Sequence, residues 1–395
     1  MAERREIESP ELDSNRLKLV FDRGRTSAFT APMDFEFLKT HELTPAIHGE
    51  IEAFLDQQSN SHPFQFPDWM GAGTSDEREK KHCAIVRVQG QIRWFAHCGV
   101  SFPAGKWLRP IRSLVINRGP ACDDADLTLY GLRKLLEKSK QMGFAYLQIA
   151  PDWVERPEWS MASALISDGW ESLPDRRSSL RLDLKAGTDE LLRSFKKDTR
   201  FNIRRSERQG IAIRLAQDEA GIQEFQRIYF EMARKKKFVA EEPSHLSHAL
   251  RWVVKQKGRG ALVLASKEGT PLGGVLVVRA GKRGWGVFSA TVKDKGLTAG
   301  HLLQWSAIRW AKERGCAEYD FGGYREGINT GPASFKRGFC EAVVHFSPSY
   351  KYRLDRRLCA FLDFATQARS KWRAPGNEMV LNSGSHAGAV EDAER

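Results

Sequence analysis

The segment LQWSAIRWAKERGCAEYDF at residues 303–321 follows the same pattern as LRKLLEKSKQMGFAYLQI at residues 132–149. In each segment apolar residues recur at helical spacing, a glycine follows, and an apolar run comes directly after it. Gly143 and Gly315 stand where helix C-caps are expected, because glycine readily adopts the left-handed conformation that ends helices. The pattern therefore predicts, twice in one chain, a helix that runs directly into a strand.

Two further features recur in the same order. An apolar strand, a glycine turn and a second strand are predicted around Gly90 and again around Gly269. A short helix, a glycine–aromatic pair and a strand are predicted at 165–184 and again at 335–346. The offsets between matching glycines are 179, 172 and 169 residues, so order and spacing are both kept. The repeat predicts two copies of one α/β unit.

The repeat also divides the chain. We predict a flexible arm at 1–34, a first α/β domain at 35–180 and a second at 181–356, followed by a C-terminal helix with a disordered tail at 357–395. A length of 395 residues favours two domains on its own, because single cores rarely serve so long a chain.

Composition bounds the class of partner. Lys and Arg outnumber Asp and Glu by 62 to 50, a net charge of +12, which is typical either of a protein with a polyanionic partner or of one that is basic for solubility. The six cysteines are scattered without metal-ligand spacing, so we expect no metal site. No apolar window approaches the roughly 18 residues of a spanning helix. We therefore expect a cytoplasmic protein that is at most peripheral at the membrane.

The motifs YDFGGY at 319–324 and FKRGF at 335–339 hold the candidate catalytic residues. Lys336 could stabilise negative charge on an acyl carbonyl or bind a donor phosphate, or it could be a solvated surface lysine. Asp320 could orient an amine or accept its proton, or it could cap a turn and pair with an arginine. Substrate-binding candidates in the same motifs are Phe335, Gly322, Gly323 and Tyr324; the glycines would permit close backbone approach.

Two basic clusters are candidate contacts for phosphates. Arg200 and Arg204 lie at helical spacing in a run with few acids, which favours a polyanion-binding face and a solvated face about equally. Lys235 lies in a second cluster at 234–237.

The order of elements resembles the GNAT acyltransferase fold, a mixed sheet splayed near its middle with helices on both faces. Two such units, the basic segment 191–213, and the DFGG and FKRGF motifs together resemble the Fem-type peptidoglycan aminoacyltransferases over about residues 35–356. The short interval 238–260 leaves no room for the coiled-coil arm of some members. The resemblance implies two tandem GNAT-like domains without that arm, with the chemistry in the second. It also implies that residues matching Phe335, Lys336 and Lys235 contact substrates.

The same resemblance implies transfer of an amino acid from aminoacyl-tRNA to an amine of a nucleotide- or lipid-linked cell-wall precursor, without a cofactor. Such an enzyme would serve peptidoglycan synthesis, cell wall biogenesis and cell shape, and we expect it to be a monomer. The alternative is an acyl-CoA-dependent N-acyltransferase of a polysaccharide or envelope pathway. Gly296 and Gly300, before the second long helix, partly match the loop with which GNAT enzymes bind the CoA pyrophosphate. A third hypothesis is a non-catalytic binding protein on the same fold.

Overall fold

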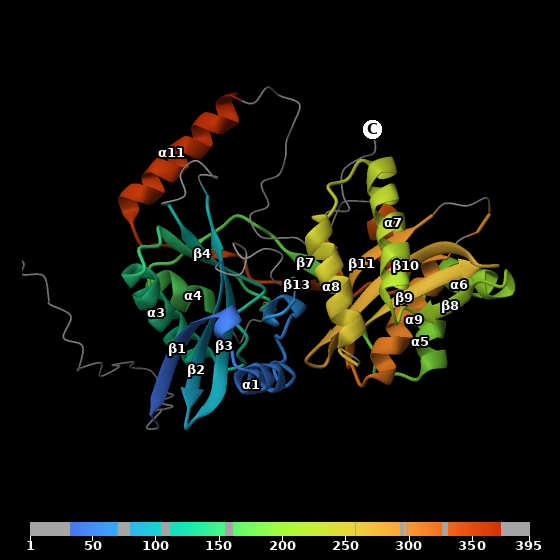
Figure 1. Ribbon diagram of the computed structural model, residues 1–395, viewed down its shortest axis with the longest axis horizontal. Coiled ribbons are helices and arrows are strands. Elements are labelled where there is room, and N and C mark those ends of the chain that lie inside the picture. The colour runs from blue at the N-terminus through green and yellow to red at the C-terminus, as the bar shows by residue number, and fades with distance from the viewer. Residues whose placement is uncertain are drawn as a thin grey trace, which may run out of the picture.

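The protein, analysed as a computed structural model, consists of two lobes that lie side by side (Figure 1). The structure describes residues 32–69, 80–103, 111–154, 161–256, 258–292, 296–297, 299–325 and 331–372, with side chains up to 364. The predicted arm, apart from residues 32–34, and the predicted tail from 373 onward lie outside these residues.

The first lobe is built on a sheet with the strand order β1-β2-β3-β4-β5-β14-β6. Its strands are Met33–Lys39, Lys81–Val88, Gln91–Ser101, Ser113–Asn117, Tyr146–Ala150, Tyr350–Arg353 and Glu171–Ser172, in that order. Its helices are η1 (Thr40–Glu42), α1 (Pro45–Leu55), η2 (Pro63–Gln65), α3 (Ala125–Gln141), α4 (Met161–Ser167) and the C-terminal α11 (Arg356–Trp372). Only β4 and β5 pair in parallel, so the sheet is mixed.

The second lobe repeats the plan with the strand order β13-β7-β12-β11-β10-β9-β8. Its strands are Val343–His345, Ser178–Asp183, Glu318–Tyr324, Arg283–Thr291, Thr270–Ala280, Gly260–Lys267 and Ala212–Leu215, in that order. Its helices are α5 (Thr188–Ser194), α6 (Lys197–Arg208), α7 (Glu219–Lys236), α8 (Pro243–Lys255), α9 (Gly300–Glu313) and α10 (Gly331–Arg337). Only residues 237–242 join α7 to α8, so no coiled-coil arm is present among the described residues of this lobe.

The two copies exchange strands. β7 lies between β12 and β13 in the second sheet, and β14, from the end of the second copy, lies between β5 and β6 in the first. The predicted boundary at 180/181 therefore falls inside a strand of the second sheet, and residues 350–353, assigned by sequence to the second domain, complete the first sheet. The structural counterpart of β7 is β14, whereas the sequence repeat matched the segment around β7 to 343–346.

The repeated glycines act as the sequence predicts. Gly90 and Gly269, each with φ of 78°, turn the two hairpins, and Gly143 and Gly315, with φ of 70° and 76°, end α3 and α9. Because left-handed φ values are costly for residues with a Cβ, these positions fix where each element stops.

The second sheet has different covers on its two faces. Leu262 and Leu264 of β9 point into a core shared with α7, α8 and residues of the first lobe such as Phe66. Val263, from the same strand, points into the core formed with α5, α6 and α9. The two lobes are therefore joined by a continuous apolar core, and α6 and α7 lie on opposite faces of the sheet (Figure 1). None of the described helices is long and apolar enough to cross a membrane.

Candidate active site

The site is built where the parallel pair β11 and β12 separates. The two strands are paired only from Arg283/Glu318 to Trp285/Asp320. Beyond that point β11 continues alongside β10 to Thr291, and β12 continues alongside β7 to Tyr324. Register shifts at Leu276/Val277 of β10, opposite β11, and at Asp320/Gly323 of β12 accompany the divergence. The strands thus splay and leave backbone groups on their facing edges.

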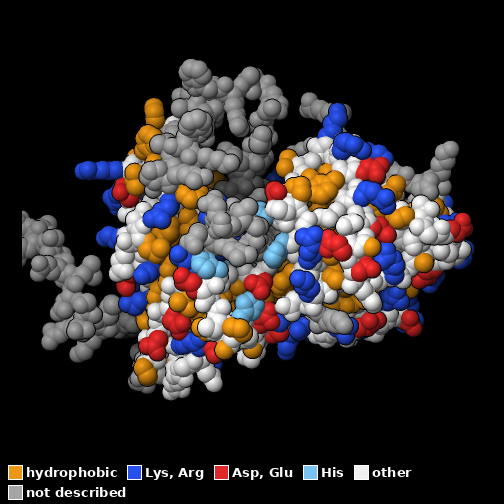
Figure 2. Space-filling view, in the orientation of Figure 1, with side chains coloured by type: hydrophobic (Ala, Val, Ile, Leu, Met, Phe, Trp, Pro, Cys, Tyr) orange, Lys and Arg blue, Asp and Glu red, His pale blue; other side chains and the backbone are white. Residues whose placement is uncertain are grey.

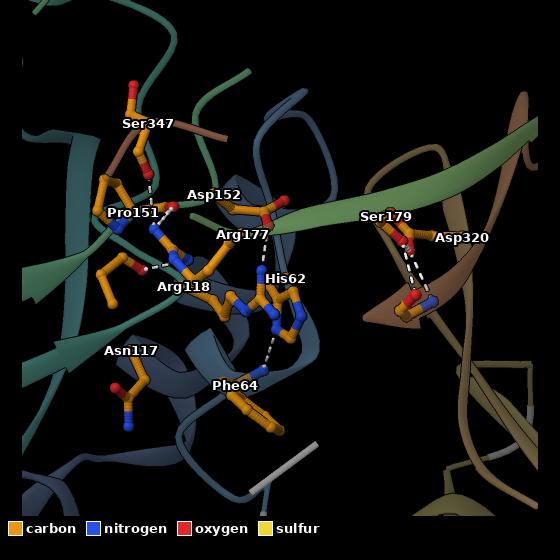
Figure 3. Close-up of polar contacts among 12 residues, drawn as sticks. His62, Phe64, Asn117, Arg118, Pro151, Asp152, Arg177, Ser179, Asp320 and Ser347 are labelled. Atoms are coloured by element: carbon orange, nitrogen blue, oxygen red, sulfur yellow. Dashed lines mark hydrogen bonds and ion pairs between the residues drawn. The ribbon is translucent and has the colours of Figure 1, made fainter. Parts of the chain in front are cut away.

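Asp320 lies at the fork of this splay and is fully buried. Its carboxylate accepts hydrogen bonds from Arg181 Nε at 2.9 Å and from the Gly322 backbone N–H at 2.9 Å. It also accepts one from the Ser179 hydroxyl (Figure 3). A carboxylate with three donors inside the sheet is held in place, and these contacts support the turn-capping and arginine-pairing role among the two that the sequence left open.

The glycines after Asp320 bring the predicted lysine to the splay. Gly322 has φ of 70° and its carbonyl accepts from the Ser179 hydroxyl at 3.0 Å. Lys336, in the last turn of α10, donates to the Gly323 carbonyl at 2.6 Å and to the Gly322 carbonyl at 3.4 Å. The structure therefore places Asp320, Gly322, Gly323 and Lys336 together.

Phe335 lies near the start of α9, close to the end of β11. A Cβ on Gly300, the first residue of α9, would lie 3.7 Å from the Phe335 ring and 3.8 Å from Thr291 Cγ2. The ring also contacts His301 and Phe339, with centroid separations of 4.8 and 5.3 Å. The splay is thus flanked by an aromatic cluster and by the N-terminus of a 14-residue helix.

His301, the second residue of α9, lies beside Phe335 and is not among the site residues that the sequence predicts. Burial lowers its pKa below the ordinary value, so the imidazole is neutral at pH 7 and can accept a proton. No local motif marks it, because it meets Phe335 only through folding. Tyr324, predicted to bind substrate, is buried instead: its carbonyl accepts from the Ser178 hydroxyl at 2.5 Å.

The corresponding region of the first domain is closed. β4 and β5 stay paired to their ends, Asn117 against Ala150, and the Arg118 backbone N–H extends the ladder to the Ala150 carbonyl at 2.7 Å. Gln148 stands opposite Lys351 of β14 where the second sheet has Asp320 opposite Arg181. Among the described residues, the splay and the lysine thus occur in the second domain only.

A buried ionic network beneath the site links the two domains. Asp152, which follows β5, accepts from Arg283 at 2.8 Å and lies 3.6 Å from Arg181. It also accepts from Arg118 at 3.3 Å (Figure 3). Arg181 therefore connects the domain interface with Asp320. Burial, reinforced by the positive charge of Arg118 and its neighbours, holds the pKa of the adjacent His62 well below its usual range. The network fixes the fork of the splay relative to the first domain.

The predicted phosphate contacts do not converge. Arg200 and Arg204 lie on α6 and Lys235 on α7, across the second sheet from each other. Arg200 donates to the Arg193 carbonyl at 3.0 Å and to the Phe195 carbonyl, so part of its guanidinium holds the α5–α6 turn. Lys235 is exposed and pairs with Glu231 at 2.6 Å. On the face shown in Figure 2, Lys and Arg are interspersed with Asp and Glu over the second domain.

No group of three or more His, Cys, Asp or Glu side chains suited to a metal ion occurs among the described residues. The N-terminus of α9 is suited to a phosphate-bearing group, because backbone N–H groups and the helix dipole favour an anion there.

Comparison with known proteins identifies the class. Residues 193–337 match the model of the acetyltransferase (GNAT) domain family. No curated protein matches the chain. Among solved structures, FemX is 16% identical, with a TM-score of 0.70 over 82% of this chain and 99% of FemX. L-PGS from Bacillus licheniformis is 14% identical, with a TM-score of 0.53 over 81% of this chain and 96% of that one.

The C-terminal domain of a protein assigned as lysylphosphatidylglycerol synthetase, from Agrobacterium fabrum, is also 14% identical, with a TM-score of 0.50 over 81% of this chain and 96% of that one. At such identities the likeness is one of fold. The chain carries a GNAT acetyltransferase domain in its second half, and its two-domain fold is that of FemX. The predicted resemblance to Fem-type proteins is thus confirmed in the fold, and the findings support an acyltransferase.

Proposed function

We propose that the protein is an aminoacyltransferase that moves an amino acid from aminoacyl-tRNA to an amine of a peptidoglycan precursor. The observation that carries the proposal is the splay between β11 and β12, flanked by Lys336 and Phe335, in the second of two GNAT-fold domains. The two-domain fold shared with FemX supports it. Interpeptide bridge formation in cell wall biogenesis would be its role.

The reaction is aminolysis of an ester. The acceptor amine attacks the ester carbonyl carbon, the tetrahedral oxyanion collapses, and the tRNA ribose hydroxyl leaves. Lys336 would stabilise the oxyanion electrostatically, an effect worth about 10²–10³ in rate. His301, which is neutral at pH 7, would accept the proton that the amine loses and pass it to the ribose oxygen as that oxygen leaves. Positioning of both substrates in the splay would supply most of the remaining acceleration.

Charge supports polyanionic substrates. The net charge is +12, and both aminoacyl-tRNA and a nucleotide- or lipid-linked precursor carry phosphates. We propose that no cofactor takes part, that the protein acts as a monomer in the cytoplasm, and that a lipid-linked precursor would bring it into peripheral contact with the membrane.

A second candidate is an acyl-CoA-dependent N-acyltransferase of an envelope or polysaccharide pathway. Two observations favour it: the family match is to an acetyltransferase domain, and the N-terminus of α9 opens beside the splay. In this case the α9 N-terminus would bind the CoA pyrophosphate.

One experiment tests the choice. The full chain is incubated with a muropeptide precursor and either radiolabelled aminoacyl-tRNA or radiolabelled acetyl-CoA, and label on the precursor is measured. The proposal expects transfer from the tRNA that ribonuclease treatment abolishes. Transfer from acetyl-CoA alone would overturn it in favour of the second candidate.

A further inference from the structure

A stripe of exposed cationic and aromatic side chains follows the outer face of α6. Lys197, Phe201, Arg204 and Arg208 occur at i, i+4, i+7 and i+11, so helical geometry aligns them on one face. They line one surface hollow together with Arg200 and Glu207. The opposite face of α6 is buried through Thr199, Ile203 and Ser206.

Phe201 is the unusual member of this stripe. It is 54% exposed, on the side of α6 away from the buried Ile203 two residues on, and its neighbours along the exposed face are arginines and a lysine rather than apolar residues. Large aromatic side chains interleaved with cations are the pattern with which proteins bind single-stranded nucleic acid, because bases stack on the ring while cations contact the phosphates. We propose that this stripe, Lys197–Phe201–Arg204–Arg208, binds a single-stranded RNA segment.

The length of the stripe favours a polynucleotide. At about 1.5 Å per residue, Lys197 and Arg208 are about 16 Å apart along the helix axis. Successive phosphates of one helical strand are spaced by about 3.4 Å along the axis, so the stripe spans several of them. The phosphates of one CoA molecule would occupy only part of it.

α6 is also tied to the elements that flank the splay. At its N-terminal end, the Lys196 backbone N–H donates to the Gly338 carbonyl at 2.9 Å, just after α10 and Lys336. Farther along, Arg205 and Gln209 donate to the Gly296 carbonyl, ahead of α9, at 3.1 and 3.0 Å. An RNA strand on the stripe would thus be positioned relative to Lys336. The choice of RNA rests on the proposed function, in which this strand is the unpaired 3′ end of the donor tRNA.

The test measures binding without any transfer. A fluorescein-labelled single-stranded RNA oligonucleotide ending in CCA is titrated with the full chain at several salt concentrations, and fluorescence anisotropy is recorded. Phe201→Ala should weaken binding by roughly 5-fold or more, the lower range for loss of one stacked base. Arg204→Gln/Arg208→Gln should weaken it by roughly 10- to 50-fold at 0.1 M salt and reduce the salt slope by about 1.4.

The matched control is Arg356→Gln/Arg357→Gln, which removes two exposed arginines from α11 of the other domain and should leave binding unchanged. Thermal unfolding of each variant checks that it folds as the wild type does. Wild-type affinity in both α6 variants would overturn the inference while leaving the proposed function standing. No RNA binding by the wild type would sink both.

CoA and phosphatidylglycerol vesicles serve as competing probes. If Phe201→Ala abolished CoA or vesicle binding and left RNA binding intact, the stripe would belong to that ligand and the inference would be wrong. The inference would also be wrong if CoA displaced RNA from the wild type and lost this effect in Arg204→Gln/Arg208→Gln. If a blunt RNA duplex bound as tightly as the single strand, stacking of an unpaired base on Phe201 would not contribute to binding and the inference would be wrong.

Discussion

Replacement of Asp320 by asparagine separates the two roles that its sequence left open. The side chain is fully buried and accepts from Arg181, Ser179 and the Gly322 N–H. Asparagine keeps the shape and one acceptor oxygen, but it removes the charge opposite Arg181 and can turn an NH₂ group towards that guanidinium. The change is therefore expected to destabilise the second sheet.

The magnitude follows from the geometry. Opposite charges 2.9 Å apart attract by about 6 kcal/mol at an effective dielectric constant of about 20. Arg181 keeps two weaker partners, Asp152 at 3.6 Å and Glu318 at 3.8 Å, which lessen the loss. We expect Asp320→Asn to cost about 3 kcal/mol, the lower end for breaking a buried pair. For a unit of the second domain's size this lowers Tm by roughly 6–12 °C.

The assay is thermal unfolding, followed by transfer measured well below the lowered Tm. Asp183→Asn is the matched control, because Asp183 lies on the neighbouring strand β7 with its side chain 64% exposed, and its loss should shift Tm by less than about 2 °C. If Asp320 has a structural role, Asp320→Asn should be unstable but should keep a transfer rate within about tenfold of the wild-type rate. Wild-type Tm combined with a loss of about 10²-fold or more would refute this and make Asp320 a general base.

Three further predictions address the site and the fold. Gly322→Ala should reduce transfer and lower the free energy of unfolding by about 1–2 kcal/mol, because Gly322 has a φ of 70°. Gly323→Ala should change the urea midpoint little, because no atom lies within 4 Å of the added Cβ. Equal effects of the two substitutions would contradict the strain argument. Lys336→Gln should lower kcat by about 10²-fold with Tm unchanged, and undiminished kcat would remove its electrostatic role. Burial lowers the pKa of His97 to about 4, so between pH 6.5 and pH 4 the unfolded chain binds a proton that the folded chain does not. The free energy of unfolding should therefore be highest above pH 6.5 and fall towards pH 4. Urea midpoints measured across this range should fall less steeply in His97→Asn than in the wild type.

The local features of the fold were predictable because they depend on short segments. Gly143 and Gly315 mark helix ends through their own backbone conformation, and the hairpins around Gly90 and Gly269 need only a turn between apolar runs. The exchange of β7 and β14 was not predictable in this way. Short strands of similar pattern fit either sheet, and the choice depends on partners such as Arg181 for Asp320, 139 residues away.

In the candidate site too, the residues of local motifs were predictable, whereas those brought together by folding were not. Asp320 and the glycines lie in one local motif and Lys336 lies in the next motif along the chain, and the structure brings them together. His301 joins Phe335 only through the packing of α9 against α10, so no spacing announces it. The basic residues at 200–204 and at 234–237 are both predicted phosphate contacts, yet the sheet separates them, because the core that each helix buries decides the face on which it lies.

The central claim, that the splay of the second domain serves aminoacyl transfer, is tested most directly by single-turnover transfer from radiolabelled aminoacyl-tRNA to a muropeptide amine by wild type and Lys336→Gln. We expect a labelled peptide bond with the wild type, sensitive to ribonuclease pretreatment of the donor, and a rate lower by about 10²-fold with the variant. Transfer from acetyl-CoA with none from any aminoacyl-tRNA would contradict the claim.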